Sequence, residues 1–117
     1  MLKRTNLQEL HLFSGGGEER EVLLCLSRGN DPNMPDGDGW TPLHWACYRQ
    51  QPEMVKLLLE KGASVELRSF SGDTPLHACA TEGSLPCLRL VLDAAEKADA
   101  KILDVQNNVG YVFVTMV

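Results

Sequence analysis

The sequence contains no apolar run long enough to cross a membrane, and its first residues lack the pattern of a secretory signal. A membrane-spanning helix needs about 20 consecutive apolar residues, and no stretch of that length occurs. Two basic residues stand near the N-terminus, but Asn6, Gln8, Glu9 and His11 interrupt the segment that follows them. We therefore expect neither membrane insertion nor secretion through a signal peptide.

Motifs that carry catalysis, cofactors or metals are also missing. The chain has no GxSxG, no HExxH and no CxxC. Glycines 15–17 precede two acidic residues and no Lys-Ser or Lys-Thr pair, which argues against a phosphate-binding loop. Pro32 and Pro35 interrupt the acidic residues between Asp31 and Asp38, which argues against a calcium loop. We expect a protein that is not an enzyme and that holds no cofactor and no metal.

The charge balance lacks the basic excess that nucleic-acid binding requires. The formal net charge is -5 at pH 7, whereas a nucleic-acid-binding protein presents a basic face to the phosphates. The four cysteines, Cys25, Cys47, Cys79 and Cys87, include no CxxC pair. Without a secretory signal they are expected to be reduced thiols. Core packing is their expected role, with a redox role at Cys87 as the alternative.

The most informative feature is an internal repeat of 33 residues. The tetrapeptide TPLH at 41–44 returns at 74–77, and Gly39 returns as Gly72. His11 precedes the first TPLH histidine by the same interval. The apolar columns in this register are Val22, Val55 and Leu88; Cys25, Leu58 and Val91; and Leu26, Leu59 and Leu92. Agreement of so many columns at one shift indicates a repeat protein.

Each unit carries the signals of two short helices joined by a turn. Thr41 suits a helix N-cap, and Pro42 suits the first helical position, where its missing N–H is not needed. This first helix is expected to run to about Arg49. Pro52 starts a second helix, which Gly62 ends because glycine accepts the left-handed backbone conformation. Apolar residues three and four apart give the second helix one apolar stripe.

The following unit repeats this order, with Thr74 as the cap and Pro75 at the first helical position. One helix pair cannot bury both of its faces, so successive pairs must stack to enclose a continuous core. The sequence therefore predicts an all-α protein built from stacked helix pairs.

With TPLH, the 33-residue spacing and the frame GAxVxx…GxTPLH, the sequence resembles the ankyrin-repeat family. The resemblance covers about residues 5–111 and implies a solenoid of helix-turn-helix units with β-hairpin connections. The first repeat lacks Thr-Pro, as expected of an N-terminal cap, and the third has extra residues that predict a longer second helix or loop. We expect a single domain over 1–117 with repeats at about 5–36, 37–69 and 70–107, and a truncated fourth repeat at 108–117.

The resemblance assigns structural roles to the residues that recur in each repeat. In the family, the histidine of TPLH links the hairpin to the helix termini through hydrogen bonds. A shared metal is excluded because successive repeats are roughly 10 Å apart, whereas metal–nitrogen bonds are near 2 Å. The residues expected to hold the fold are Thr41, Pro42, His44, Gly62, Thr74, Pro75 and His77.

The resemblance also implies protein–protein recognition through the hairpin tips and the concave face of the first helices. Tryptophan, tyrosine and arginine contribute most to binding energy at interfaces, and acidic neighbours predict a partner with a basic segment. Packing between hairpins is the alternative role for Trp40 and Phe70, and Trp45 is expected to pack between repeats. The predicted partner-binding residues are Asp36, Asp38, Trp40, Tyr48, Arg49, Phe70, Asp73, Thr81, Glu82 and Tyr111.

An interaction module or adaptor is the function that the resemblance favours. Two other interpretations stay open: a targeting fragment of a larger enzyme or channel, and a truncated splice product without stable function. The splice product is suggested by the residues YVFVTMV, which stand where a further TPLH is expected. The expected location of the chain is the cytoplasm, the nucleus or both.

Overall fold

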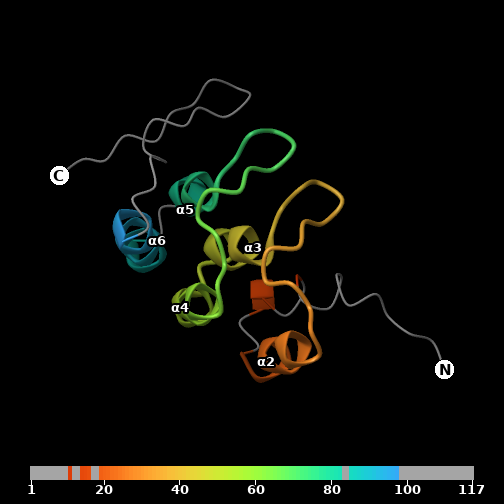
Figure 1. The fold of residues 1–117 in the computed structure, drawn as a ribbon. Coiled ribbons are helices and arrows are strands. Elements are labelled where there is room, and N and C mark those ends of the chain that lie inside the picture. The colour runs from red at the N-terminus through yellow and green to blue at the C-terminus, as the bar shows by residue number, and fades with distance from the viewer. Residues whose placement is uncertain (1–10, 12–13, 17–18, 83–84, 98–117) are drawn as a thin grey trace.

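The computed structural model of the chain describes residues 11, 14–16, 19–82 and 85–97. Residues 11 and 14–16 are helical, and the longer ranges contain the helices named in Figure 1. Their bounds are α2 Glu19–Ser27, α3 Pro42–Tyr48, α4 Pro52–Glu60, α5 Pro75–Glu82 and α6 Leu85–Lys97. Since the described residues contain helices and no strands, the all-α prediction is confirmed.

The helices lie in two layers, with the first helix of each repeat in one layer and the second helix in the other (Figure 1). α3 packs along α5 in the first layer, and α4 packs between α2 and α6 in the second. Within each repeat the two helices also contact each other, α3 with α4 and α5 with α6. This stacking places equivalent residues of successive repeats side by side, as the sequence columns predict.

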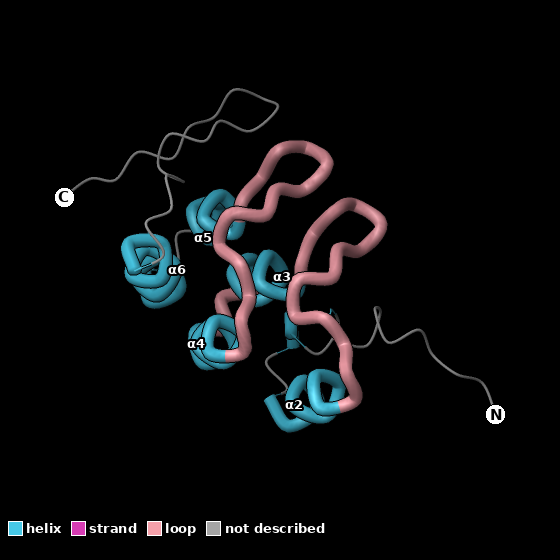
Figure 2. Tube along the Cα trace, in the orientation of Figure 1, coloured by secondary structure: helices cyan, strands magenta, loops and turns pink. Residues whose placement is uncertain are grey.

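Two loops project from the same side of the first helix layer (Figure 2). We call residues 33–40 the first hairpin loop and residues 66–73 the second. In the first loop the Asp36 N–H donates to the Trp40 carbonyl at 2.8 Å, and the equivalent bond in the second loop has the same length. The two loops follow the path of hairpins, but neither contains a β-strand. The backbone hydrogen bonds between the two sides of each loop are confined to its closing turn.

α3 begins with a capping box built from Thr41 and His44. The Thr41 amide and hydroxyl lie 3.1 and 2.8 Å from His44 Nδ1, and the Thr41 hydroxyl accepts from the His44 amide. Pro42 follows at the first helical position, where no N–H is needed. Thr74 and His77 repeat these bonds at the same distances at the start of α5. Both helices therefore start from the same local network.

The histidines of the first two repeats also bond to a hairpin loop. Since His44 Nδ1 accepts from a backbone N–H, Nε2 carries the proton and donates to the Asp73 carbonyl at 2.7 Å. His11 is placed equivalently one repeat earlier, with Nε2 2.8 Å from the Met34 carbonyl and 3.0 Å from the Trp40 carbonyl. Histidines one repeat apart in the sequence therefore make equivalent contacts in adjacent repeats.

The end of α4 is held by the loop of the preceding repeat. Gly62 has a φ of 96°, the left-handed conformation that the sequence predicts for it. The Asn33 side chain donates to the Gly62 carbonyl at 3.1 Å and accepts from the Ser64 N–H at 2.6 Å. The Asn33 side-chain amide thus fixes the direction of the chain between the end of α4 and the second hairpin loop.

The core lies between the helix layers. Leu43 and Leu76, equivalent residues of α3 and α5, are fully buried, as are Val55 and Leu58 on α4. The four cysteines are buried too, and Cys87 has no exposed surface. Because an oxidant cannot reach a thiol in that position, the structure favours the packing role over the redox alternative.

The third repeat has the longer second helix that its extra residues predict. α6 contains 13 residues and α4 contains 9. The remaining extra residues lie beyond Lys97, outside the described residues, as does the predicted fourth repeat at 108–117.

Candidate partner-binding groove

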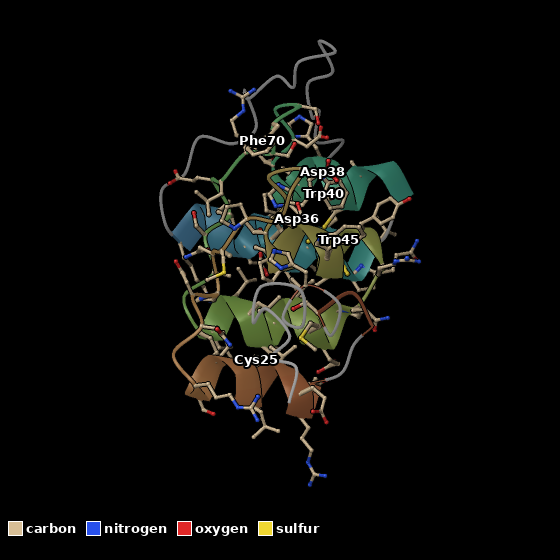
Figure 3. The ribbon with its side chains drawn as sticks, turned by 90° about the vertical axis from the view of Figure 1, so that its right-hand side faces the viewer. Cys25, Asp36, Asp38, Trp40, Trp45 and Phe70 are labelled. Atoms are coloured by element: carbon tan, nitrogen blue, oxygen red, sulfur yellow. The ribbon has the colours of Figure 1, made fainter. Side chains whose placement is uncertain are left out.

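A groove of about 700 Å³ opens between the two hairpin loops and the exposed side of α3. Its size is comparable with that of established ligand pockets. Figure 3 faces the loops and shows Asp36, Asp38, Trp40, Trp45 and Phe70 gathered on one face of the molecule. The residues that line the groove are Asp38, Trp40, Trp45, Tyr48, Phe70, Ser71 and Asp73.

An aromatic cluster forms the floor of the groove. Trp40 comes from the first hairpin loop, and Trp45 and Tyr48 come from successive turns of α3. The Trp40 ring centroid lies 5.0 Å from that of Trp45 and 5.4 Å from that of Tyr48, while Trp45 and Tyr48 are 6.3 Å apart. These are the separations of tilted and edge-to-face pairs. The rings therefore support one another and present a continuous aromatic surface.

Asp36 lies beneath this cluster and orients it. Its Oδ1 accepts from the N–H groups of Asp38 and Trp40 at 2.9 Å, and its Oδ2 accepts from Trp45 Nε1 at 2.7 Å. Burial opposes ionisation of Asp36, but the bonds from Trp45, Asp38 and Trp40 outweigh it and hold the pKa of the carboxyl below its usual value. One carboxylate thus fixes both the turn of the loop and the position of the Trp45 ring.

Replacing Asp36 with asparagine should loosen the Trp45 ring. A neutral amide has one acceptor oxygen and cannot receive both the indole N–H and the backbone N–H groups. We expect the free energy of unfolding to fall by about 1–3 kcal/mol, measured by urea denaturation. The Trp45 indole signal in a nitrogen–proton NMR spectrum should also shift. Asp38→Asn is the control, since this exposed side chain in the same turn should cost less than about 0.5 kcal/mol; equal losses would contradict the role of Asp36.

The Phe70 ring marks the outer edge of the groove, with 72% of its surface exposed. The Phe70 N–H donates to the Asp38 carbonyl at 3.0 Å and so joins the two hairpin loops. Gly39 lies directly against it, because a Cβ there would come within 2.7 Å of Phe70 Cδ1. Phe70 therefore packs on the neighbouring hairpin loop, as the alternative role for it predicts, and still exposes most of its ring.

Arg49 extends the aromatic surface on one side. Its Cζ lies 5.9 Å from the centre of the Tyr48 ring, within the range of a cation–π contact. Arg49 is exposed and does not belong to the residues that line the groove. A guanidinium group thus lies next to the Tyr48 ring at the edge of the cluster.

The described parts of the chain contain neither a metal-binding cluster nor a membrane-spanning helix. These parts contain no group of three or more side chains arranged to hold a metal ion. None of the helices there has the length and apolar character that crossing a bilayer demands. The groove itself offers aromatic rings and carboxylates, which are groups of non-covalent recognition.

Comparison with known proteins agrees with the repeat seen in the structure. A family model described as ankyrin repeats, in three copies, matches residues 10–104. The chain belongs to the ankyrin-repeat family. Ankyrin repeats are generally protein–protein interaction modules and are typically not enzymes. The solenoid that the 33-residue columns predict is therefore the fold of this family.

Relatives of very different kinds carry similar ankyrin repeats. The B-cell lymphoma 3 protein homolog of Mus musculus is 34% identical over 96 residues, which is 81% of this chain and 21% of the relative. Target of rapamycin complex 2 subunit AVO2 of Saccharomyces cerevisiae is 36% identical over 88 residues, 74% of this chain and 21% of the relative. The transient receptor potential channel pyrexia of Drosophila melanogaster is 36% identical over 78 residues, 66% of this chain and 8% of the channel. The chain thus spans about a fifth or less of the length of these relatives.

The ankyrin fold brings half of the predicted binding residues to the groove. Asp36 lies behind the lining as a support, and Arg49 lies beside it. Thr81 and Glu82 end α5, and Tyr111 lies outside the described residues, as do the side chains of Thr81 and Glu82. The predicted residues that line the groove are Asp38, Trp40, Tyr48, Phe70 and Asp73.

The sequence prediction missed the part that Trp45 plays in the groove. It assigned Trp45 to packing between repeats, and the ring does approach the first repeat, since a Cβ at Gly15 would lie 3.9 Å from Trp45 Cε3. The same ring also lines the groove and donates to Asp36. The sequence did contain one chemical signal: a partly buried indole N–H needs an acceptor, and Asp36 precedes Trp45 by 9 residues. Ser71, which also lines the groove, had no comparable signal.

Proposed function

We propose that this ankyrin-repeat chain is a protein-binding module that holds its partner in the groove between the hairpin loops and α3. The observation that carries the proposal is the grouping of four aromatic side chains, Trp40, Trp45, Tyr48 and Phe70, around one opening. Aromatic residues that are held rigidly and clustered dominate the binding energy of interfaces. The contacts among these rings fix their positions before binding, which lowers the entropy lost on association.

The charge of the groove favours a partner with a basic segment. Asp38 and Asp73 line it, and the ionised Asp36 lies directly behind. Negative surfaces attract basic segments and raise their rate of association, and they repel the phosphates of nucleic acids. We place this encounter in the cytoplasm or nucleus, where buried thiols such as Cys47 remain reduced.

The relatives support a second form of the proposal, in which the module directs a larger protein to its partner. By their names, pyrexia is a channel and AVO2 is a subunit of a complex, and both are several times longer than the region they share with this chain. In such a protein the repeats supply binding, and any catalysis or transport belongs to other domains. Whether the chain acts alone or as part of a larger protein, its proposed role is binding and not catalysis.

Phe70→Ala and Leu85→Ala together test whether the groove is the binding surface. The two side chains are matched in exposure, at 72% and 71%, but Leu85 begins α6 and does not line the groove. Proteins captured from a lysate by the wild type and by each variant are compared by mass spectrometry, and the main partner is then purified for affinity measurement. Truncating an aromatic anchor should weaken binding about 30-fold, whereas Leu85→Ala should change it less than about twofold.

Circular dichroism and urea denaturation first establish that both variants remain folded. If the partner binds Phe70→Ala as tightly as it binds the wild type, but binds Leu85→Ala more weakly, the interface lies elsewhere and the proposal is wrong. A folded wild-type chain that captures no specific protein would support the truncated product without stable function.

A further inference from the structure

We infer that the groove binds an arginine side chain of the partner, with its guanidinium on the aromatic floor and between the carboxylates of Asp38 and Asp73. This inference rests on the proposed function and adds the chemistry of the bound residue. It differs from a general attraction for basic segments because it selects arginine over lysine.

The floor of the groove presents a favourable surface to a flat cation. The faces of aromatic rings attract cations within about 6 Å of the ring centre. The Trp40 centroid is 5.0 Å from Trp45 and 5.4 Å from Tyr48, with the ring planes tilted by 58° and 77°, so a guanidinium that stacks on one ring lies close to the others. Trp40, Trp45 and Tyr48 are each only partly buried, so their surfaces remain accessible from the groove.

Carboxylates approach the groove from both hairpin loops. Asp38 belongs to the first loop and is exposed, and no hydrogen bond or ion pair to its carboxylate is found in the described part of the chain. Asp73 belongs to the second loop, where its N–H bonds to Ser69 Oγ at 3.1 Å and its carbonyl accepts from His44. The backbone of Asp73 is thereby fixed beside the groove. A guanidinium has donors on two edges and can bond to a carboxylate on either side.

One ring of the cluster already lies beside a guanidinium group of the chain itself. Arg49 places its guanidinium over the Tyr48 ring at 5.9 Å. A guanidinium stacks on a ring with its plane and is weakly hydrated, so it loses little solvation in such a contact. A lysine ammonium is compact and strongly hydrated, so it loses more solvation on binding, and it has no flat surface to stack on a ring. The groove offers an arginine both aromatic rings for stacking and carboxylates for hydrogen bonds.

Labelled peptides test this inference directly. The probe is a fluorescein-labelled nine-residue peptide in which three arginines alternate with glycine and serine. Matched peptides carry lysine or citrulline in place of arginine, the latter having nearly the same shape without the charge. Binding to the full chain is measured by fluorescence anisotropy at low salt. We expect the lysine peptide to bind about fivefold more weakly and the citrulline peptide at least about tenfold more weakly.

Two matched variants locate the binding. Asp38→Asn should weaken the arginine peptide at least about threefold, and Asp93→Asn, which removes an exposed carboxylate from α6, should leave the affinity within about 1.5-fold. The indole NMR signals of Trp40 and Trp45 should shift with the arginine peptide and stay in place with citrulline. Equal affinity for arginine and lysine, or equal loss in the two variants, overturns the inference.

These results are separable from those that test the proposed function. If no arginine peptide binds but partner capture still depends on Phe70, the groove is an interface and the arginine inference alone fails. If capture does not depend on Phe70, the proposed function itself fails.

Discussion

Gly39→Ala should lose about 2–5 kcal/mol of folding free energy, although it adds a single methyl group. Gly39 has a φ of 81°, a left-handed conformation that costs any other residue about 1–2 kcal/mol. The added Cβ would also stand 2.8 Å from the Phe70 backbone nitrogen and 2.7 Å from its ring. The backbone cannot withdraw without breaking the Phe70–Asp38 hydrogen bond that joins the hairpin loops. Urea denaturation of the purified variant measures the loss.

Gly62→Ala separates the steric effect from backbone strain. Gly62 has a comparable φ of 96°, but a Cβ there meets no atom within 4 Å. It should therefore cost only the strain, about 1–2 kcal/mol. Adding Phe70→Ala to Gly39→Ala removes the ring contact and leaves the backbone contact, so stability should return in part. Equal losses at Gly39 and Gly62 would mean that the two loops can separate without cost.

Acidification should destabilise the fold through His44 well before most carboxylates take up protons. Burial lowers the pKa of His44 to about 4 from 6.5, against the opposing effects of its bond to the Asp73 carbonyl and the nearby carboxylates of Asp73 and Asp36. The unfolded chain therefore binds a proton near pH 6.5 that the folded chain does not bind until about pH 4. The stability contributed by the neutral ring is fully present above pH 6.5 and falls as the pH drops toward 4. The total loss is about 3 kcal/mol.

His44→Gln isolates this contribution. We expect urea denaturation of the wild type to show about 2 kcal/mol less stability at pH 5 than at pH 7. The glutamine variant is less stable at neutral pH because it loses the bonds to Thr41 and Asp73. It should nevertheless lose clearly less than the wild type between the two pH values, since it has no proton to gain at this position. A wild-type stability that is the same at pH 5 and pH 7 would contradict the prediction.

Most of the scaffold was predictable because repetition places equivalent residues in equivalent surroundings. Leu43 and Leu76 are identical in the sequence and equally buried in the structure. Thr41 and Thr74 start their helices through the same bonds to histidine. The first helix was expected to run to about Arg49 and ends at Tyr48. Local signals such as caps and glycines sufficed for these features, because each acts within a few residues of its own position.

The groove was predictable in its location and only partly in its composition. Asp38, Trp40 and Phe70 were placed at hairpin tips from the resemblance to the ankyrin-repeat family, and they do line the opening. Asp36 was predicted to bind the partner, and the structure shows that its carboxylate accepts from backbone N–H groups and from the Trp45 indole. Which acidic residue of a tight turn points inward depends on the rotamers and distances of the folded loop, and the repeat pattern contains no information about these.

By itself, the sequence determined the stacking of helix pairs, since the period of 33 residues requires each pair to bury its apolar stripe against the next. Only the tertiary structure decided what lies between the hairpin loops. The approach of Phe70 to Gly39 and the bond between Trp45 and Asp36 join residues whose side chains follow no period. Stacking is a property that every repeat shares, but the groove consists of residues in which the repeats differ, and their contacts form only once the repeats are assembled.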